Sequence, residues 1–348
     1  MSECESLNIV HLILSRGFAG SERSTAESCN EQVCDHEVAL IIRRDHRKNG
    51  NSIVDKLDPR VKVIEVPARL FTAKKVSMAI ERVQPDVIHC HLRRATRIVA
   101  RGGFSAVSVS TLHIDVNSHD FLDMSGLICN ARWQVESIPK TYKGELFKAN
   151  NSLVPHRRLS DLEVLEKRQA LGLQEGDVLI GAVGRYHHSK GWETLIDAFM
   201  TVHSETLKLM FFGSGTDERK LKARAKNDPR IHFVGYQEDI KDIYQCMDIL
   251  VCPSRFEPLP RVMLEAMDAG APIIASDAGG CKELIVDYGG DMFAVDDTEQ
   301  LAAILLRRTS NIPPRFRPDL SQHYIHNANA GIVGFYRALI ATATATTR

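Results

Sequence analysis

An alternation of apolar, strand-like runs with amphipathic, helix-like stretches, which occurs twice along the chain, most constrains what these 348 residues can fold into. Repeated βα units predict parallel sheets that helices cover on both faces. Two such sets in series predict an α/β fold with two doubly wound domains. The length agrees, because a chain of this size exceeds one ordinary hydrophobic core.

The two sets of elements have similar lengths and spacing. In the first half we expect strands at 7–14, 37–42, 61–66, 86–90 and 106–111, and helices at 21–33, 71–83 and 93–102. In the second half we expect strands at 178–183, 207–212, 231–234, 248–252 and 272–275, and helices at 191–203, 216–226, 239–246 and 260–269. The pattern is interrupted at about 150–176, which predicts a linker and domains 1–155 and 156–320. A last helix is expected at 321–340, with a frayed tail at 341–348.

Composition excludes several classes of protein. Lys and Arg together number 44, as do Asp and Glu, and no nucleic-acid recognition motif is present. No apolar run is long enough to span a bilayer. The eight cysteines, Cys4 included, form no C-x-x-C pair, and the acidic start of the chain does not resemble a signal peptide. These features predict reduced thiols and a cytoplasmic location.

Ligands of open α/β sheets bind beyond the carboxyl ends of the strands, so the loops at those ends are the first places to look for a site. The first strand ends in a loop with Gly17 and Gly20 that opens a helix. Glycines let the backbone approach a ligand, and a helix N-terminus attracts anions. The loop matches neither G-x-G-x-x-G nor a P-loop, so a tight structural turn is an equal alternative.

The strand at 178–183 ends in a glycine-flanked loop that carries Arg185 and Lys190. A guanidinium fork and an ammonium point charge, five residues apart at a strand end, suit a diphosphate. The alternative is a solvated basic turn.

The strand at 248–252 is followed by Glu257 and Glu265, eight residues apart, with Pro260 suited to the first turn of a helix. A helix through the whole span would put both carboxylates on one face, about 12 Å apart. Carboxylates accept strong hydrogen bonds from sugar hydroxyls. The alternative is a solvated helix face, but the apolar neighbours of Glu265 are unusual for a surface position.

The second half resembles the retaining glycosyltransferases of the GT-B fold, the glycosyl transferases group 1 family. The resemblance covers about 178–305 and weakly the first 150 residues. It rests on five segments: Val183-Gly184-Arg185 with Lys190-Gly191, Phe212-Gly213-Ser214-Gly215, Phe233-Val234-Gly235, the E-x7-E pair, and Ala278-Gly279-Gly280 with Glu283. It implies two Rossmann-like domains facing each other across a cleft, with the last helix packed back on the first domain.

The resemblance also implies roles for particular residues. The catalytic set would be Glu257, His113, Arg185 and Lys190. The donor-binding set would be Gly17, Gly20, Gly184, Arg185, Lys190, Gly213, Leu259, Arg261 and Glu265. The expected reaction retains the anomeric configuration, needs neither a metal nor another cofactor, and uses a nucleotide sugar, with UDP favoured by its frequency in the family. Pro258 and Pro260 replace glycines of many relatives, which puts the phosphate contacts of that loop in question.

A basic stripe on the helix expected at 93–102 suggests the acceptor. Arg93, Arg97 and Arg101 recur at every fourth position, Arg94 lies beside them, and His91 precedes them. We assign Arg93, Arg94, Arg97 and His91 to acceptor binding, against the alternative of a solvated face. A second basic cluster is Arg43, Arg44, Arg47 and Lys48. The chain is similar to enzymes of lipopolysaccharide core assembly, which predicts a phosphorylated saccharide or glycolipid acceptor and peripheral contact with an anionic membrane.

Three alternatives remain at this point. A metal-dependent hydrolase could use His89, His91 and His113, with Asp115 and His119 nearby. A different GT-B enzyme, an epimerase or a phosphorylase, would need no saccharide acceptor. A non-catalytic sugar-nucleotide binding module would have no need of the complete set of charged residues.

Overall fold

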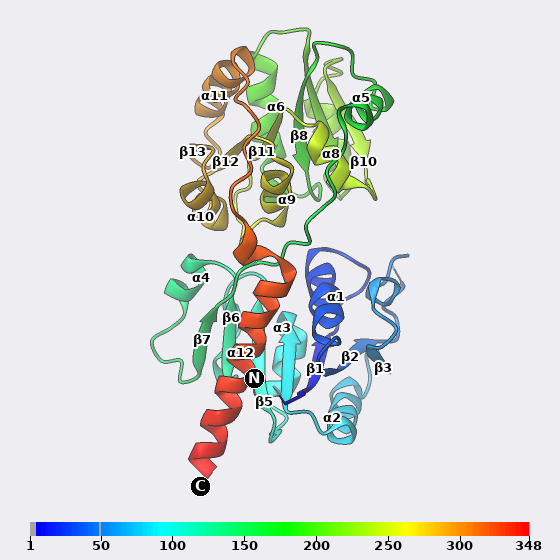
Figure 1. Cartoon of the computed structure of the whole chain (residues 1–348), viewed down its shortest axis with the longest axis vertical. Helices are drawn as coiled ribbons and strands as arrows, with labels where there is room; N and C mark the ends of the chain where they lie inside the picture. The colour runs from blue at the N-terminus through cyan, green and yellow to red at the C-terminus, as the bar shows by residue number, and fades with distance from the viewer. Residues whose placement is uncertain (1–4, 49, 348) are drawn as a thin grey trace. The chain divides into compact units, whose positions relative to one another are not determined.

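The computed structural model describes residues 5–48 and 50–347, so Cys4 and Arg348 lie outside the described residues. The chain divides into two compact units (Figure 1). Unit 1 is Met1–Ser152 together with Gln322–Arg348, and unit 2 is Leu153–Ser321. The last segment of the chain therefore belongs to the first unit.

Unit 1 is built on a parallel sheet that has seven strands among the described residues, in the order β3-β2-β1-β4-β5-β6-β7. The strands are β1 (Asn8–Ile13), β2 (Glu37–Arg43), β3 (Lys62–Val66), β4 (Val87–His91), β5 (Val107–Leu112), β6 (Gly126–Cys129) and β7 (Glu145–Lys148). The chain runs outward from β1 to β3 and then returns to β4 beside β1. The crevice at the carboxyl ends of β1 and β4 is thus the topological switch point, where such sheets bind ligands.

Helices cover both faces of this sheet. They are α1 (Gly20–Gln32), α2 (Thr72–Val83), α3 (Leu92–Ala100), α4 (Arg132–Ser137) and α12 (Ile325–Thr347), with the short 3-10 helices η1 (Ile53–Lys56), η2 (His119–Asp123) and η4 (Ser321–His323). Val76 of α2 and Val99 of α3 pack with Val10 and Leu12 of β1 on one face. Tyr336 of α12 packs with Ile9 on the other face, and α12 also contacts α1 (Figure 1).

Unit 2 repeats the plan with a parallel sheet of six described strands, in the order β10-β9-β8-β11-β12-β13. The strands are β8 (Val178–Val183), β9 (Leu207–Phe212), β10 (Ile231–Gly235), β11 (Ile249–Cys252), β12 (Ile273–Ser276) and β13 (Asp291–Phe293). The helices are α5 (Asp161–Ala170), η3 (His188–Lys190), α6 (Trp192–Thr201), α7 (Glu218–Arg224), α8 (Ile240–Cys246), α9 (Arg261–Ala269), α10 (Gly279–Tyr288) and α11 (Thr298–Ser310). Trp192, Phe199 and Phe211 are fully enclosed in its core. Here the switch point lies between β8 and β11.

The prediction of two doubly wound α/β domains is confirmed, and each strand expected from periodicity is present. The prediction of a linker over about 150–176 is wrong for α5, which Ser160 caps by accepting a hydrogen bond from the Glu163 amide. Arg168 then ties α5 to Asp248 and to the carbonyl of Cys246. The expected frayed tail is also wrong, since α12 continues to Thr347.

Two further observations concern the cysteines and the helices of the described residues. Seven cysteines are free thiols: Cys29, Cys34, Cys90, Cys129, Cys246, Cys252 and Cys281. Among the helices of residues 5–48 and 50–347, none is both long and apolar enough to cross a bilayer.

Candidate active site

The loops after β8 and β11 in unit 2 lie side by side at the switch point of the sheet. Gly191, the C-cap of η3, has φ +64°, a conformation that favours glycine. A side-chain carbon at this position would come within 1.9 Å of the Pro253 carbonyl oxygen. The amide of Arg255 donates to the carbonyl of Ser189 over 2.8 Å. The two loops are therefore fastened together at close range.

This contact brings Lys190 and Glu257 together. The ammonium of Lys190 forms an ion pair with Oε1 of Glu257, which also accepts from Ser254 Oγ at 3.1 Å. The Glu257 side chain is only 8% exposed. Burial opposes the charge of Lys190, but Glu257 and two neighbouring cysteines outweigh it, so its pKa is raised above the ordinary value. Lys190 thus stays cationic in a largely dehydrated place, as an anion site requires.

Glu265 lies in the middle of α9 and is 5% exposed, so the alternative of a solvated helix face is wrong. Arg261, one turn earlier, lies 4.0 Å from its carboxylate. The helix expected at 260–269 is confirmed to within one residue, because α9 begins at Arg261 and Pro260 is its N-cap. Glu257 therefore stands in the loop before the helix, and Leu259 between them is buried.

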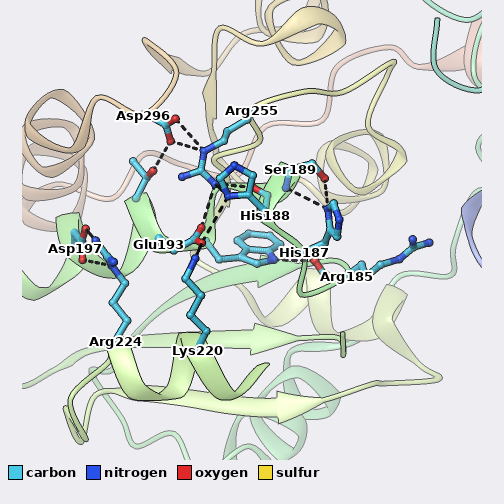
Figure 2. Close-up of polar contacts among 12 residues, drawn as sticks. Arg185, His187, His188, Ser189, Glu193, Asp197, Lys220, Arg224, Arg255 and Asp296 are labelled. Carbon is cyan, nitrogen blue, oxygen red and sulfur yellow. Dashed lines mark hydrogen bonds and ion pairs between the residues drawn. The ribbon is translucent and has the colours of Figure 1, made fainter. Parts of the chain in front are cut away.

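Arg185 differs from Lys190 in its surroundings. Its side chain is exposed and, among the described residues, makes no hydrogen bond or ion pair, while its carbonyl accepts from Trp192 Nε1 at 2.9 Å. Figure 2 shows the guanidinium extending away from the neighbouring polar network. Gly184 and Gly213 lie where two strand ends meet, and a side-chain carbon at Gly213 would come within 2.0 Å of the Gly184 carbonyl oxygen.

Arg255 is a residue of this site that the sequence reasoning missed. Its guanidinium contacts Asp296 at 2.9 Å, Glu193 at 3.1 Å and the His188 carbonyl at 2.5 Å (Figure 2). Burial raises the pKa of Glu193, but its pairs with Lys220 and Arg255 outweigh this effect and hold the value at about 2. This network anchors the loop that carries Lys190. Its partners are distant in sequence, so no local motif could have revealed it.

In unit 1 the loop after β1 has the geometry expected of a close strand–helix turn. Gly17 has φ +77° and its amide donates to the His46 carbonyl over 2.8 Å, while Gly20 is the first residue of α1 with open space around it. Two of the four cations in the second basic cluster have acidic partners. Arg43 pairs with Asp45, and Arg47 pairs with Asp55 at 2.7 Å.

Four histidines of unit 1 gather on the side of the sheet that α1 and α12 cover. His11, His89 and His91 hold nitrogen atoms within 4.8 Å of one another, and His113 extends the group from the end of β5. His91 is 3% exposed and both its nitrogens are hydrogen-bonded, to His11 at 3.0 Å and to His113 at 3.2 Å. The structure therefore gives the predicted acceptor residue His91 an internal position.

The arginine stripe on α3 is confirmed as a surface only in part. Arg93 and Arg97 are exposed and, within the described part of the chain, form no ion pair. Arg94 is half-buried and donates to the carbonyl of Ala68 and to Thr72 Oγ1, whereas Arg101 pairs with Asp120 at 2.9 Å. Arg94 thereby joins α3 to the segment before α2, where Leu70 and Phe71 are 76% and 72% exposed. An exposed apolar pair beside basic residues was not foreseen.

Comparison with known proteins finds a family match in the second half of the chain. Residues 177–311 match the family model described as glycosyl transferases group 1. A lipopolysaccharide core biosynthesis mannosyltransferase, LpsB of Rhizobium meliloti (strain 1021), is 31% identical over 151 residues, which are 39% of this chain and 42% of LpsB. The chain spans less than half the length of this and three further curated relatives.

Solved structures extend the likeness of fold to the whole chain. The structure of Anabaena Alr3699/HepE in complex with UDP and glucose has a TM-score of 0.75 at 19% identity, covering 98% of this chain and 99% of the other. WaaG, a glycosyltransferase involved in lipopolysaccharide biosynthesis, has a TM-score of 0.65 at 16% identity, covering 97% and 98%. The expected GT-B fold is thus confirmed, and residues 177–311 match the expected family. The described strands form two open sheets, and the comparisons give the hydrolase alternative no support.

Proposed function

We propose, from the premise that the chain belongs to the glycosyl transferases group 1 family through residues 177–311, that it transfers a sugar from a nucleotide-sugar donor to a saccharide acceptor. One observation carries the proposal. A buried lysine–glutamate pair, Lys190 with Glu257, stands at the switch point of the family's domain, with a second buried carboxylate, Glu265, on the next helix. A cation beside hydroxyl-binding carboxylates suits a diphosphate flanked by two sugars.

In this proposal, the charged side chains of the unit 2 site bind different parts of the donor. Lys190 and the exposed Arg185 balance the diphosphate charge, Glu265 binds the ribose hydroxyls and Glu257 contacts the transferred sugar. Leu259 and Arg261 supply backbone amides at the start of α9, a nine-residue helix whose dipole favours an anion. Pro260 has no amide hydrogen, so the contacts come from the residues on either side of it. Gly184 and Gly213 keep the strand ends open to the ligand.

The transfer is proposed to retain the anomeric configuration without a metal ion or another cofactor. Charge that develops on the departing nucleotide is stabilised by Lys190, Arg185 and the dipole of α9, which takes the part that a bound cation would otherwise have. From unit 1 we propose Gly17, Gly20 and His113 as further donor contacts. UDP is the favoured nucleotide of the donor, and the likeness to a protein crystallised with UDP and glucose supports this choice.

The acceptor is proposed to be a phosphorylated saccharide or glycolipid of lipopolysaccharide core or other surface-glycan assembly. Arg93 and Arg97 offer unpaired positive charge for phosphate, and Leu70 and Phe71 offer apolar surface for acyl chains or lipid. This combination favours peripheral contact with an anionic membrane at its cytoplasmic face. His91 leaves the acceptor set, since both its nitrogens are already bonded inside unit 1.

The test is a transfer assay with the full-length protein. UDP-, GDP- and ADP-sugars are each incubated with phosphorylated core oligosaccharides, with and without EDTA, and products are read by mass spectrometry and by the anomeric proton signal in NMR. The proposal expects one donor class to add a single sugar with the donor's anomeric configuration, unaffected by EDTA. Sugar released or isomerised without any acceptor would replace it with the epimerase or phosphorylase alternative. Hydrolysis that EDTA abolishes and zinc restores would instead support the metal-dependent hydrolase alternative.

A further inference from the structure

A continuous chain of hydrogen bonds crosses the interior of unit 1, from α12 at the end of the sequence to the tip of β5. It joins five buried or half-buried side chains in the order Asn329, Gln32, His11, His91 and His113. The successive distances are 2.9, 2.8, 3.0 and 3.2 Å. Every link lies within unit 1, and the donor proposal above uses only its last member.

Strand geometry explains why these residues meet. Successive side chains of a strand point to opposite faces, and His11 of β1 pairs in register with His89 of β4. His11, His89 and His91 therefore share the face that α1 and α12 cover. His89 takes no part in the chain, because its two nitrogens bond Tyr336 at 2.6 Å and Thr111 at 2.7 Å.

The donor and acceptor roles along this chain of hydrogen bonds follow from the orientation of the Asn329 side chain. The side-chain amide of Asn329 lies 3.2 Å from the carbonyl of Ile325, which only accepts, so its NH2 group must face that carbonyl. Its oxygen therefore faces Gln32 and accepts from the Gln32 NH2 group. The oxygen of Gln32 must then face His11.

The histidines transmit this direction because each one is neutral. Burial lowers the pKa of His11 and of His113 to about 4 and that of His91 well below its ordinary value, although Glu22 of α1 raises the pKa of His113. A neutral imidazole has one donor and one acceptor nitrogen. His11 must donate through Nε2 to Gln32, so its Nδ1 accepts from Nε2 of His91. The Nδ1 of His91 in turn accepts from Nε2 of His113.

We propose that this chain makes Asn329, Gln32, His11 and His91 positioning residues, which hold His113 in the Nε2–H tautomer and leave its Nδ1 as a hydrogen-bond acceptor. Among the described residues, Nδ1 of His113 has no partner. The group that it binds is consequently a donor such as a sugar hydroxyl, and a carboxylate there, as in a uronic acid, is repelled. This last step rests on the proposed function, whereas the tautomer does not.

Tautomers are read directly from two-bond proton–nitrogen NMR spectra of the full-length protein labelled with 15N-histidine, at pH 7. The His113 signals are identified by their loss in His113→Asn. The proposal expects Nε2–H in His11, His91 and His113. Nδ1–H in His113 of the wild type overturns it, and this reading needs no enzymatic activity.

Two variants of Asn329 then test whether α12 determines the tautomer of His113. Asn329→Leu removes the acceptor and frees the Gln32 amide to turn over, so His113 is expected to show a mixture of tautomers. Asn329→Asp keeps an oxygen toward Gln32 and is expected to keep the wild-type spectrum. An unchanged His113 in Asn329→Leu overturns the proposal.

Binding of the donor supplies a readout that a purely structural role would not move. Asn329→Leu is expected to weaken the binding of the nucleotide sugar about fivefold, the effect of one hydrogen bond, and to leave UDP affinity unchanged. Equal weakening of both ligands contradicts the assigned role of His113. If wild-type protein binds no nucleotide sugar, the proposed function fails while the spectrum still decides the tautomer.

Discussion

The two units share one topology but hold their polar residues at the switch point in opposite ways. Unit 1 uses neutral groups: buried histidines with lowered pKa values, linked by hydrogen bonds to Gln32 and Asn329. Unit 2 uses charges: Lys190 with Glu257, and Arg255 with Glu193 and Asp296. A neutral chain can fix the direction of a hydrogen bond, whereas paired charges can offset the charge of a ligand. The difference suits the two roles proposed for the units.

The largest effect is expected when unit 2 loses the positive charge of Lys190. Lys190→Ala leaves the carboxylate of Glu257 buried beside an anionic donor, and kcat/KM should fall about 100- to 1000-fold, the range found for loss of one preorganised electrostatic group. Steady-state kinetics measures the change. Lys220→Ala is the matched control, since Lys220 is 61% exposed and pairs with Glu193 rather than with Glu257. Similar losses in both variants would contradict the role assigned to Lys190.

The next effect compares one glycine from each unit. Gly191→Ala should destabilise unit 2 by about 3 kcal/mol, because φ is +64° and the added carbon meets the Pro253 carbonyl. Gly20→Ala should leave unit 1 unchanged or slightly more stable, since the added carbon meets nothing within 4 Å and alanine favours helix. Denaturant unfolding measures both. Equal costs would mean that the loop of unit 2 is no more tightly fastened than that of unit 1.

Mild acid should lower the stability of unit 1 more than that of unit 2. His11 has a folded pKa of about 4 against an ordinary 6.5, so the unfolded chain gains its proton first as the pH falls. The stability from this neutral histidine is complete above pH 6.5, declines below it, and is lower by about 2 kcal/mol at pH 5. Glu193, with a folded pKa of about 2, keeps its contribution above 4.5 and loses it only below that value.

Hydrogen exchange followed by mass spectrometry reads the two units separately. Between pH 7 and pH 5, after correction for the intrinsic rate, protection should fall in β1 and β4 and hold in β8 and β11. An equal loss in both sheets would break the comparison.

The smallest effect concerns the surface of unit 1. Arg93→Ala and Arg97→Ala should each weaken the binding of a phosphorylated acceptor about three- to fivefold, with a loss that shrinks in high salt. Arg101→Ala, whose guanidinium already pairs with Asp120, should change little. Acceptor titrations at two salt concentrations measure this. Equal effects at all three positions would return the stripe to a general solvated surface.

Local pattern predicted most of the fold and part of the site. Strand and helix periodicity located β1 to β5 and β8 to β12, and the switch-point rule singled out the loops of Lys190 and Glu257. The short strands β6, β7 and β13 were missed.

Long-range pairing accounts for what else was missed at the site. His11 lies inside an apolar run, and only the fold brings it to Gln32, 21 residues away, and to His91, 80 residues away. Arg255 likewise acquires its role through Asp296 and Glu193.

Calorimetric titration of UDP and of the matching UDP-sugar into wild type and Glu257→Gln, with EDTA present, tests the central claim most directly. The claim is that the pair Lys190–Glu257 holds the diphosphate and the transferred sugar. The account predicts that wild type binds both ligands, and that Glu257→Gln keeps UDP affinity while losing most of the extra affinity that the sugar confers. The account is contradicted if the UDP-sugar binds Glu257→Gln with the same extra affinity over UDP as it binds wild type. It is also contradicted if wild type binds no nucleotide sugar.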